Sequence, residues 1–249
     1  MKKIVSLVVA ALVMCSCADS FLSEEPVGEF MPEQVESEEN IEGIVIGAYA
    51  VLDGYYASDA INSGCSNWQF GDVVSDDAYK GGGGTGDQNQ IHLMEIFNAN
   101  PTGIDFEARW AALYEGVKRC NQAIRLLSNS TVKNKEQRLA EMRFLRGHYY
   151  FNLKVIYNLI PWIDETVVDP NEYHTKSNME FTSDQLWEKI LGEFSAAYQV
   201  LPESQSDYGR PTKMAAKAYM AKVYLYQSKW KECLSACDEA VSYTHLRAH

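Results

Sequence analysis

The sequence has little positive charge. Its 249 residues hold 22 Lys and Arg against 34 Asp and Glu, which gives a formal net charge of -12 at pH 7. Nucleic acids and anionic lipid surfaces both attract basic protein faces, so an acidic chain lacks the main source of affinity for either. We therefore expect no nucleic-acid partner, and we expect that charge does not hold this protein on a membrane.

The sequence also lacks the short motifs of common enzyme classes. It contains no Gly-x-Ser-x-Gly elbow, no His-Glu-x-x-His and no credible Cys/His pair. Lys80 precedes four glycines, but the Gly-Lys-Ser/Thr order of a phosphate loop is absent, which predicts a mobile loop. Arg143 and Arg146 lie three apart on a predicted helix, which favours paired structural arginines over an anion site, and His148 is expected in the core or at its rim. No catalytic residue and no cofactor is predicted.

Cysteines are few, and their spacing does not define a site. Beyond residue 20 there are four: Cys65, Cys120, Cys233 and Cys237. This even number permits disulfides in an oxidising compartment without requiring them. Cys233 and Cys237 lie four apart on a predicted helix face and are expected to be core thiols. With His245 they offer only three candidate ligands, too few for a structural zinc site, so no metal is predicted.

No apolar run in the sequence is long enough to cross a bilayer. The longest, from Ile4 to Met14, has about eleven residues, whereas a spanning helix needs about twenty. It follows Lys2 and Lys3 and precedes small residues, which is typical of a bacterial export signal over residues 1–16.

A cysteine at the cleavage point of that signal indicates a lipoprotein, held to a membrane by acyl chains. The small residue Ser16 favours Cys17 as the lipidated residue, because Cys15 follows the bulkier Met14. A plain secretory signal cut near Ala18 is the alternative. Residues 17–40 are acidic and read as a tether to the folded domain.

Helical periodicity dominates the rest of the sequence, which predicts an all-α protein. The first helix is expected over 41–56, with Leu52 among its inward residues. The other expected helices span 106–127, 135–157, 183–200 with Ser183 as N-cap, 212–226 and 229–242. Residues 57–103 are rich in Gly, Asn and Asp and show no helical period. They predict a long loop with room for short strands, and long ordered loops are usually functional.

The last two predicted helices fit a tetratricopeptide repeat, joined by a tight link at Gln227-Ser228. The matching positions are Met220, Ala221 and Tyr224 in the first helix and Trp230, Cys233, Cys237 and Ala240 in the second. Small residues at such positions let backbones approach. Weaker matches to the repeat pattern occur at Trp110-x2-Leu113 and at Ala140-x3-Phe144. Together they indicate a tetratricopeptide-like helical scaffold with long irregular loop insertions.

Acidic and aromatic residues gather in the 57–103 loop. Asp72, Asp76 and Asp77 lie near Trp68, Phe70 and Tyr79. Three interpretations stay open: a glycosidase pair, turn formation by Asp, and a carbohydrate site in which a ring stacks on sugar while acids accept hydroxyl hydrogens. A glycosidase needs carboxylates facing across the scissile bond, which neighbouring acids rarely do. The candidate ligand contacts are Trp68, Asp76, Asp77 and Tyr79.

Five collinear segments resemble the SusD/RagB family of Bacteroidetes outer-membrane lipoproteins. They are Cys17-Ala-Asp-Ser-Phe-Leu-Ser-Glu-Glu-Pro26, Asn67-Trp68 with Gly71-Asp-Val-Val-Ser-Asp-Asp-Ala-Tyr-Lys80, Trp110 to Asn121, Ala140 to Leu153 ending in Ile160-Pro161, and Gly209 to Tyr219 continuing to Trp230.

The resemblance implies a surface-exposed lipoprotein that captures oligosaccharide without cleaving it and delivers it to a SusC-like TonB-dependent transporter. Family members are longer, so residues 41–242 read as an incomplete family domain. Residues 243–249 read as a tail outside the family pattern.

Two other function classes remain open. A tetratricopeptide scaffold could bind a peptide or protein without sugar, which a concave helical groove lined with Asn and Lys would favour. Exposed aromatics on the 57–103 loop would favour glycan instead. An enzyme would need two carboxylates facing across a cleft.

Overall fold

The structure is a computed structural model that describes residues 38–54 and 67–247, with side chains up to residue 242 apart from Pro170. The export signal 1–16, both candidate lipidation cysteines, Cys65 and most of the acidic tether lie outside these residues. The described ranges contain helices and turns and no strand, so the all-α prediction is confirmed there. None of their helices combines the length and apolar character that crossing a bilayer requires.

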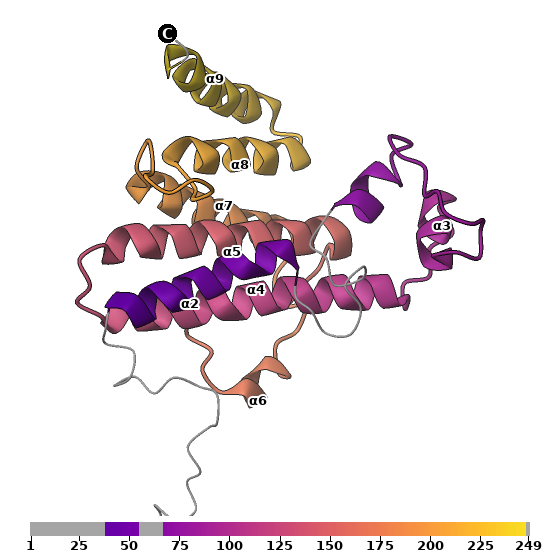
Figure 1. The fold of residues 1–249 in the computed structure, drawn as a ribbon, viewed down its shortest axis with the longest axis horizontal. Helices are drawn as coiled ribbons and strands as arrows, with labels where there is room; N and C mark the ends of the chain where they lie inside the picture. Colours follow the sequence, from indigo (N-terminus) through magenta and orange to yellow (C-terminus); the bar gives the residue numbers. More distant parts are fainter. Residues whose placement is uncertain (1–37, 55–66, 248–249) are drawn as a thin grey trace, which may run out of the picture. The chain divides into compact units, whose positions relative to one another are not determined.

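The long helices α4 (Ile104–Asn129) and α5 (Lys135–Tyr157) form the centre of the fold. They lie side by side, with a short link at 130–134 that makes them antiparallel (Figure 1). Their predicted ranges are confirmed to within two residues. A Cβ at Gly116 would lie 2.6 Å from the ring of Tyr149. Glycine at that position therefore lets the two backbones approach.

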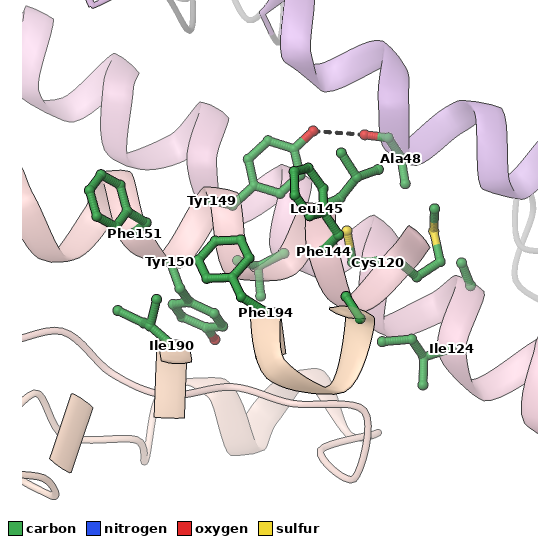
Figure 2. Close-up of a cluster of buried hydrophobic side chains, with 14 of the residues drawn as sticks. Ala48, Cys120, Ile124, Phe144, Leu145, Tyr149, Tyr150, Phe151, Ile190 and Phe194 are labelled. Atoms are coloured by element: carbon green, nitrogen blue, oxygen red, sulfur yellow. Dashed lines mark hydrogen bonds between the residues drawn. The ribbon is translucent and has the colours of Figure 1, made fainter. Parts of the chain in front are cut away.

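Helix α2 (Glu38–Ala50) lies along α4 and α5 and ends in the 3-10 turn η3 (Val51–Asp53) (Figure 1). The hydroxyl of buried Tyr149 donates to the carbonyl of Ala48 at 2.7 Å and so fastens α2 to α5 (Figure 2). The prediction that Leu52 faces inward is wrong, because it is 41% exposed. A 3-10 turn advances about 120° per residue, so with Val51 buried the next side chain points outward.

Three further helices continue the pairwise packing: α7 (Ser183–Val200), α8 (Lys213–Tyr226) and α9 (Trp230–Arg247). The N-cap of α7 is Thr182 and not Ser183, since the Thr182 hydroxyl and the Gln185 side chain form a reciprocal capping box. The loop before α7 contains the short helix α6 (Pro170–Tyr173).

Helix α9 differs from its prediction in two ways. Its backbone stays helical to Arg247, so the first five residues of the expected tail continue the helix. Cys233 is half-buried and Cys237 is exposed, so the prediction of core thiols is wrong for this pair. Up to Ser242, Ala236 is the one buried residue of α9.

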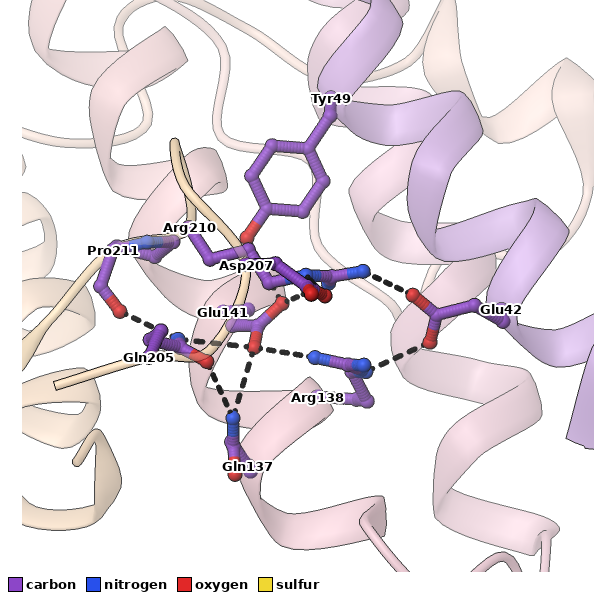
Figure 3. Close-up of polar contacts among 9 residues, drawn as sticks. All are labelled: Glu42, Tyr49, Gln137, Arg138, Glu141, Gln205, Asp207, Arg210 and Pro211. Carbon is purple, nitrogen blue, oxygen red and sulfur yellow. Dashed lines mark hydrogen bonds and ion pairs between the residues drawn. The ribbon is translucent and has the colours of Figure 1, made fainter.

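Charged side chains connect the α7–α8 loop to the start of α5 and to α2. Arg210 donates to Glu141 at 2.8 Å and pairs with Glu42, while Arg138 bonds both of these carboxylates (Figure 3). Glu141 is fully buried and also accepts the Tyr49 hydroxyl at 2.9 Å. Burial lowers the pKa of Arg210, but its bonds to Glu141 and Glu42 outweigh that effect and raise it. This cluster is structural.

A second buried cluster confirms that Arg146 is structural. Its Nε and Nη2 donate to the two carboxylate oxygens of Glu193 at 3.0 and 2.8 Å, and its Nη1 donates to Asn121. Arg143 lies 3.7 Å from Glu193. His148 is half-buried with its Nδ1 2.7 Å from the Tyr219 hydroxyl, as expected of a rim histidine.

Candidate functional site

The irregular segment 67–103 is attached to the N-terminal end of α4. Arg109, buried on α4, donates from Nη2 to the Asn67 side chain at 2.7 Å. The ring of Phe70 packs edge-on against Phe106 with centroids 5.5 Å apart, and the Arg109 guanidinium lies 5.6 Å from the Phe70 centroid. These contacts hold the start of the segment on the rigid helix pair.

The segment contains two short helices, so the prediction of a loop without helices is wrong there. They are η4 (Trp68–Asp72), which has π-helical bonding, and α3 (Asn89–Glu95), which lies beyond the start of α4 (Figure 1). Helices of five and seven residues are too short to show a periodic pattern, which explains why the sequence did not reveal them.

All four predicted ligand contacts are solvent-accessible. Trp68 on η4 is 36% exposed and Tyr79 is 76% exposed, and Asp76 and Asp77 are also exposed. One Asp77 oxygen accepts the Ser75 hydroxyl at 3.1 Å, and Asp76 has left-handed backbone at φ +64°. Turn formation therefore accounts for part of what the acids do. Both carboxylates remain open to water and to a ligand.

Tyr79 precedes a glycine-rich loop that hydrogen bonds close, while its predicted mobility stays a prediction. Lys80 is only 8% exposed, and its ammonium donates to the carbonyl of Gly84 at 2.9 Å and to that of Asp87. The N–H of Gly83 donates to the Asp87 carboxylate at 2.9 Å. The loop thus folds around the lysine side chain.

The backbone of the same lysine connects to α3. The N–H of Lys80 donates to the Glu95 carboxylate at 3.1 Å. This bond, followed by the smaller effect of His92, lowers the pKa of Glu95. The bond therefore connects the backbone that follows Tyr79 to α3.

Two exposed apolar residues that were not predicted as contacts directly follow α3. Ile96 is 51% exposed and Phe97 is 77% exposed. Phe97 adopts left-handed backbone at φ +54°, a conformation that costs a residue with a Cβ roughly 1–2 kcal/mol. Phe97 stands out in the sequence as an aromatic among Asn and Ala at 98–100, in the loop already singled out.

A separate hollow of about 340 Å³ lies along α4. It is lined by Trp110, Tyr114, Pro161, Ile163 and Tyr173 among others, and by none of the predicted contacts. The Tyr114 hydroxyl is engaged, since it donates to the Pro161 carbonyl at 2.7 Å. Within the described residues no three His, Cys, Asp or Glu side chains form a group that could hold a metal ion.

Most of this chain is similar to known proteins. A SusD-like family model, described as "Starch-binding associating with outer membrane", matches residues 20–225. SusD-like protein P2 of Formosa agariphila is 25% identical over 95% of this chain. The chain spans 45% of that relative.

Solved structures agree with this match. A laminarin-binding SusD-like protein shares 26% identity at a TM-score of 0.69, covering 82% of this chain and 43% of its own. Surface glycan-binding protein A from Bacteroides thetaiotaomicron, solved with laminarihexaose, shares 28% identity at a TM-score of 0.67 over the same shares. With four-fifths of its residues matched by the family model, this chain belongs to the SusD-like family.

Proposed function

We propose that this protein captures oligosaccharide on the irregular segment 67–103, without cleaving it. The observation that carries the proposal is the open ring of Tyr79, 76% exposed and three residues from the exposed carboxylate of Asp76. A sugar presents an apolar C–H face for a ring and hydroxyls for carboxylate oxygens. An aromatic ring beside acceptors complements both of these features.

The anchoring of the segment supports binding over a merely solvated turn. Trp68 follows Asn67, which Arg109 holds, and Tyr79 precedes Lys80, whose ammonium is enclosed. Because the backbone next to both rings is fixed in this way, ordering it costs little conformational entropy when a ligand stacks on the rings, which improves affinity. Because two similar structures carry laminarin or laminarihexaose in their names, laminarin is the first glycan to test.

Family membership and the signal pattern support a proposal for the location and the partner of this activity. We infer a protein anchored in the outer membrane through an acylated Cys17 and exposed at the cell surface. Its partner in this proposal is a SusC-like TonB-dependent transporter. The antiparallel pair α8–α9 supports the further proposal that the helices are tetratricopeptide-type repeats that form a scaffold for the inserted segment.

If the protein were instead a tetratricopeptide scaffold that binds a peptide, we would expect a concave helical groove lined with Asn and Lys. A hollow of about 430 Å³ between α8 and α9 contains Lys217 and Lys231 but no Asn among its lining residues. The exposed rings of segment 67–103 are the feature that a peptide-binding scaffold does not require. They favour the glycan proposal.

Affinity gel electrophoresis of the purified chain tests this proposal. Gels containing laminarin, soluble starch, xylan or mannan are compared with a gel without polymer. We expect retardation by at least one polymer and its loss in Trp68→Ala. Tyr208→Ala is the matched control, because Tyr208 is also a fully exposed ring but lies far from segment 67–103. It is in the α7–α8 loop, which Arg210 connects to Glu141 near the start of α5, whereas segment 67–103 adjoins the end of α5. Unretarded migration in every gel contradicts the proposal.

A further inference from the structure

Phe97 occupies the position in a helix end that normally belongs to glycine. The N–H of Asn98 donates to the carbonyl of Leu93 at 2.8 Å, and the N–H of Phe97 donates to that of Met94 at 3.0 Å. This pair of bonds defines a Schellman motif, whose left-handed residue is usually Gly. Here the left-handed residue is Phe97, at φ +54°.

Nothing in the packing of Phe97 offsets the cost of this backbone. Its side chain is 77% exposed, so the ring gains little from burial. Five non-glycine residues in the described ranges have positive φ: Asp76, Gln88, Phe97, Asn158 and Ser228. Phe97 is the aromatic one among them, and a bulky residue in this region is an outlier that calls for a functional reason.

The hydrogen bond from the Lys80 backbone to Glu95 connects the segment that carries Tyr79 to the helix that precedes Phe97. Tyr79 immediately precedes Lys80, and Phe97 follows Glu95 by two residues. The two rings are almost equally exposed, at 76% and 77%. Two open rings therefore lie on backbone segments that this hydrogen bond connects.

We propose that Phe97 is a second carbohydrate-stacking ring of the same surface, retained in a strained position because its ring must face solvent. This inference rests on the proposed glycan-binding function and deepens it. In this proposal each of the two rings stacks on a different sugar unit. The ligand is then an oligosaccharide of at least two pyranose units, and a free monosaccharide engages only one of the rings.

The decisive variant is Phe97→Gly, because it separates binding from stability. Glycine adopts left-handed backbone without strain, so the melting temperature should stay the same or rise by up to about 3 °C. Removing one stacking ring should weaken binding of laminarihexaose, or of the polymer that retards the wild type, by about tenfold. Phe97→Tyr keeps the ring and should keep the affinity.

Ser228→Gly is the matched control, since Ser228 also has left-handed backbone at φ +56° and lies in the α8–α9 turn. It should relieve strain in the same way and leave binding unchanged. Equal affinity of wild type and Phe97→Gly overturns this inference and leaves the proposed function standing. A wild-type protein that binds none of the glycans overturns the proposed function and this inference together.

Discussion

Replacing Lys80 with methionine should open the loop beside Tyr79 while leaving the helical core folded. Methionine has a side chain of similar length but cannot donate to the carbonyls of Gly84 and Asp87. Hydrogen bonds from charged donors contribute about 1.5–3 kcal/mol each, and we take the lower value because the other loop residues are mostly exposed. Losing two such bonds destabilises the closed loop by about 3 kcal/mol, which raises its open population roughly 100-fold.

Hydrogen exchange followed by mass spectrometry measures this opening directly. The hydrogen-bonded backbone amides of Gly83 and Asp87 should exchange about 100-fold faster in Lys80→Met, whereas those of α4 and α5 should not change. The backbone bond from residue 80 to Glu95 does not involve the side chain, so it persists in the variant. Lys118→Met, at an exposed position on α4, controls for the loss of a charge.

The same variant connects the loop to function. If the enclosed ammonium fixes the backbone next to Tyr79, Lys80→Met should weaken glycan binding along with the faster exchange. Unchanged exchange at Gly83 and Asp87 would refute the reasoning, because it would show that the lysine does not hold the loop.

Two further predictions concern the helical core and its pH dependence. Gly116→Ala should lower the free energy of unfolding by about 2–3 kcal/mol, since its Cβ would lie 2.6 Å from the ring of buried Tyr149. In contrast Gly192→Ala, with nothing within 4 Å, should raise it by about 0.5–1 kcal/mol, and urea unfolding of both variants checks the pair. Burial, with repulsion from Arg109 and Lys222, lowers the pKa of His148 to about 4. As pH falls from 6.5 toward 4, His148 binds a proton in the unfolded chain but stays neutral in the folded protein. The free energy of unfolding therefore falls by about 1.4 kcal/mol per pH unit. His148→Gln should remove most of that slope between pH 7 and 5 in urea unfolding, and an unchanged slope would contradict the assignment.

The sequence predicted the long helices well because their apolar residues recur over many turns. The range 135–157 matches α5, and α4 differs from its prediction by two residues at each end. Short elements were missed: η4 and α3 span five and seven residues among glycines and amides. The exposure of Cys237 was also missed, because periodicity shows that residues share a helix face but does not show which neighbour covers that face.

The candidate site was predicted in part. An aromatic and acidic cluster in a long loop is visible in composition, which identified Trp68 and Tyr79 as candidates. The enclosure of Lys80 could not be predicted, since it depends on carbonyls four and seven residues away in a turn without a known motif. The role of Phe97 depends on a left-handed backbone angle, which no local pattern indicates for phenylalanine.

The account depends most on Tyr79 as an open ring that contacts sugar. Isothermal titration of the glycan that retards the wild-type protein into wild type, Tyr79→Ala, Tyr79→Phe and Tyr208→Ala tests this directly. We predict that affinity falls about tenfold in Tyr79→Ala and stays near wild type in the other two variants. Equal affinity in Tyr79→Ala and wild type would contradict the account.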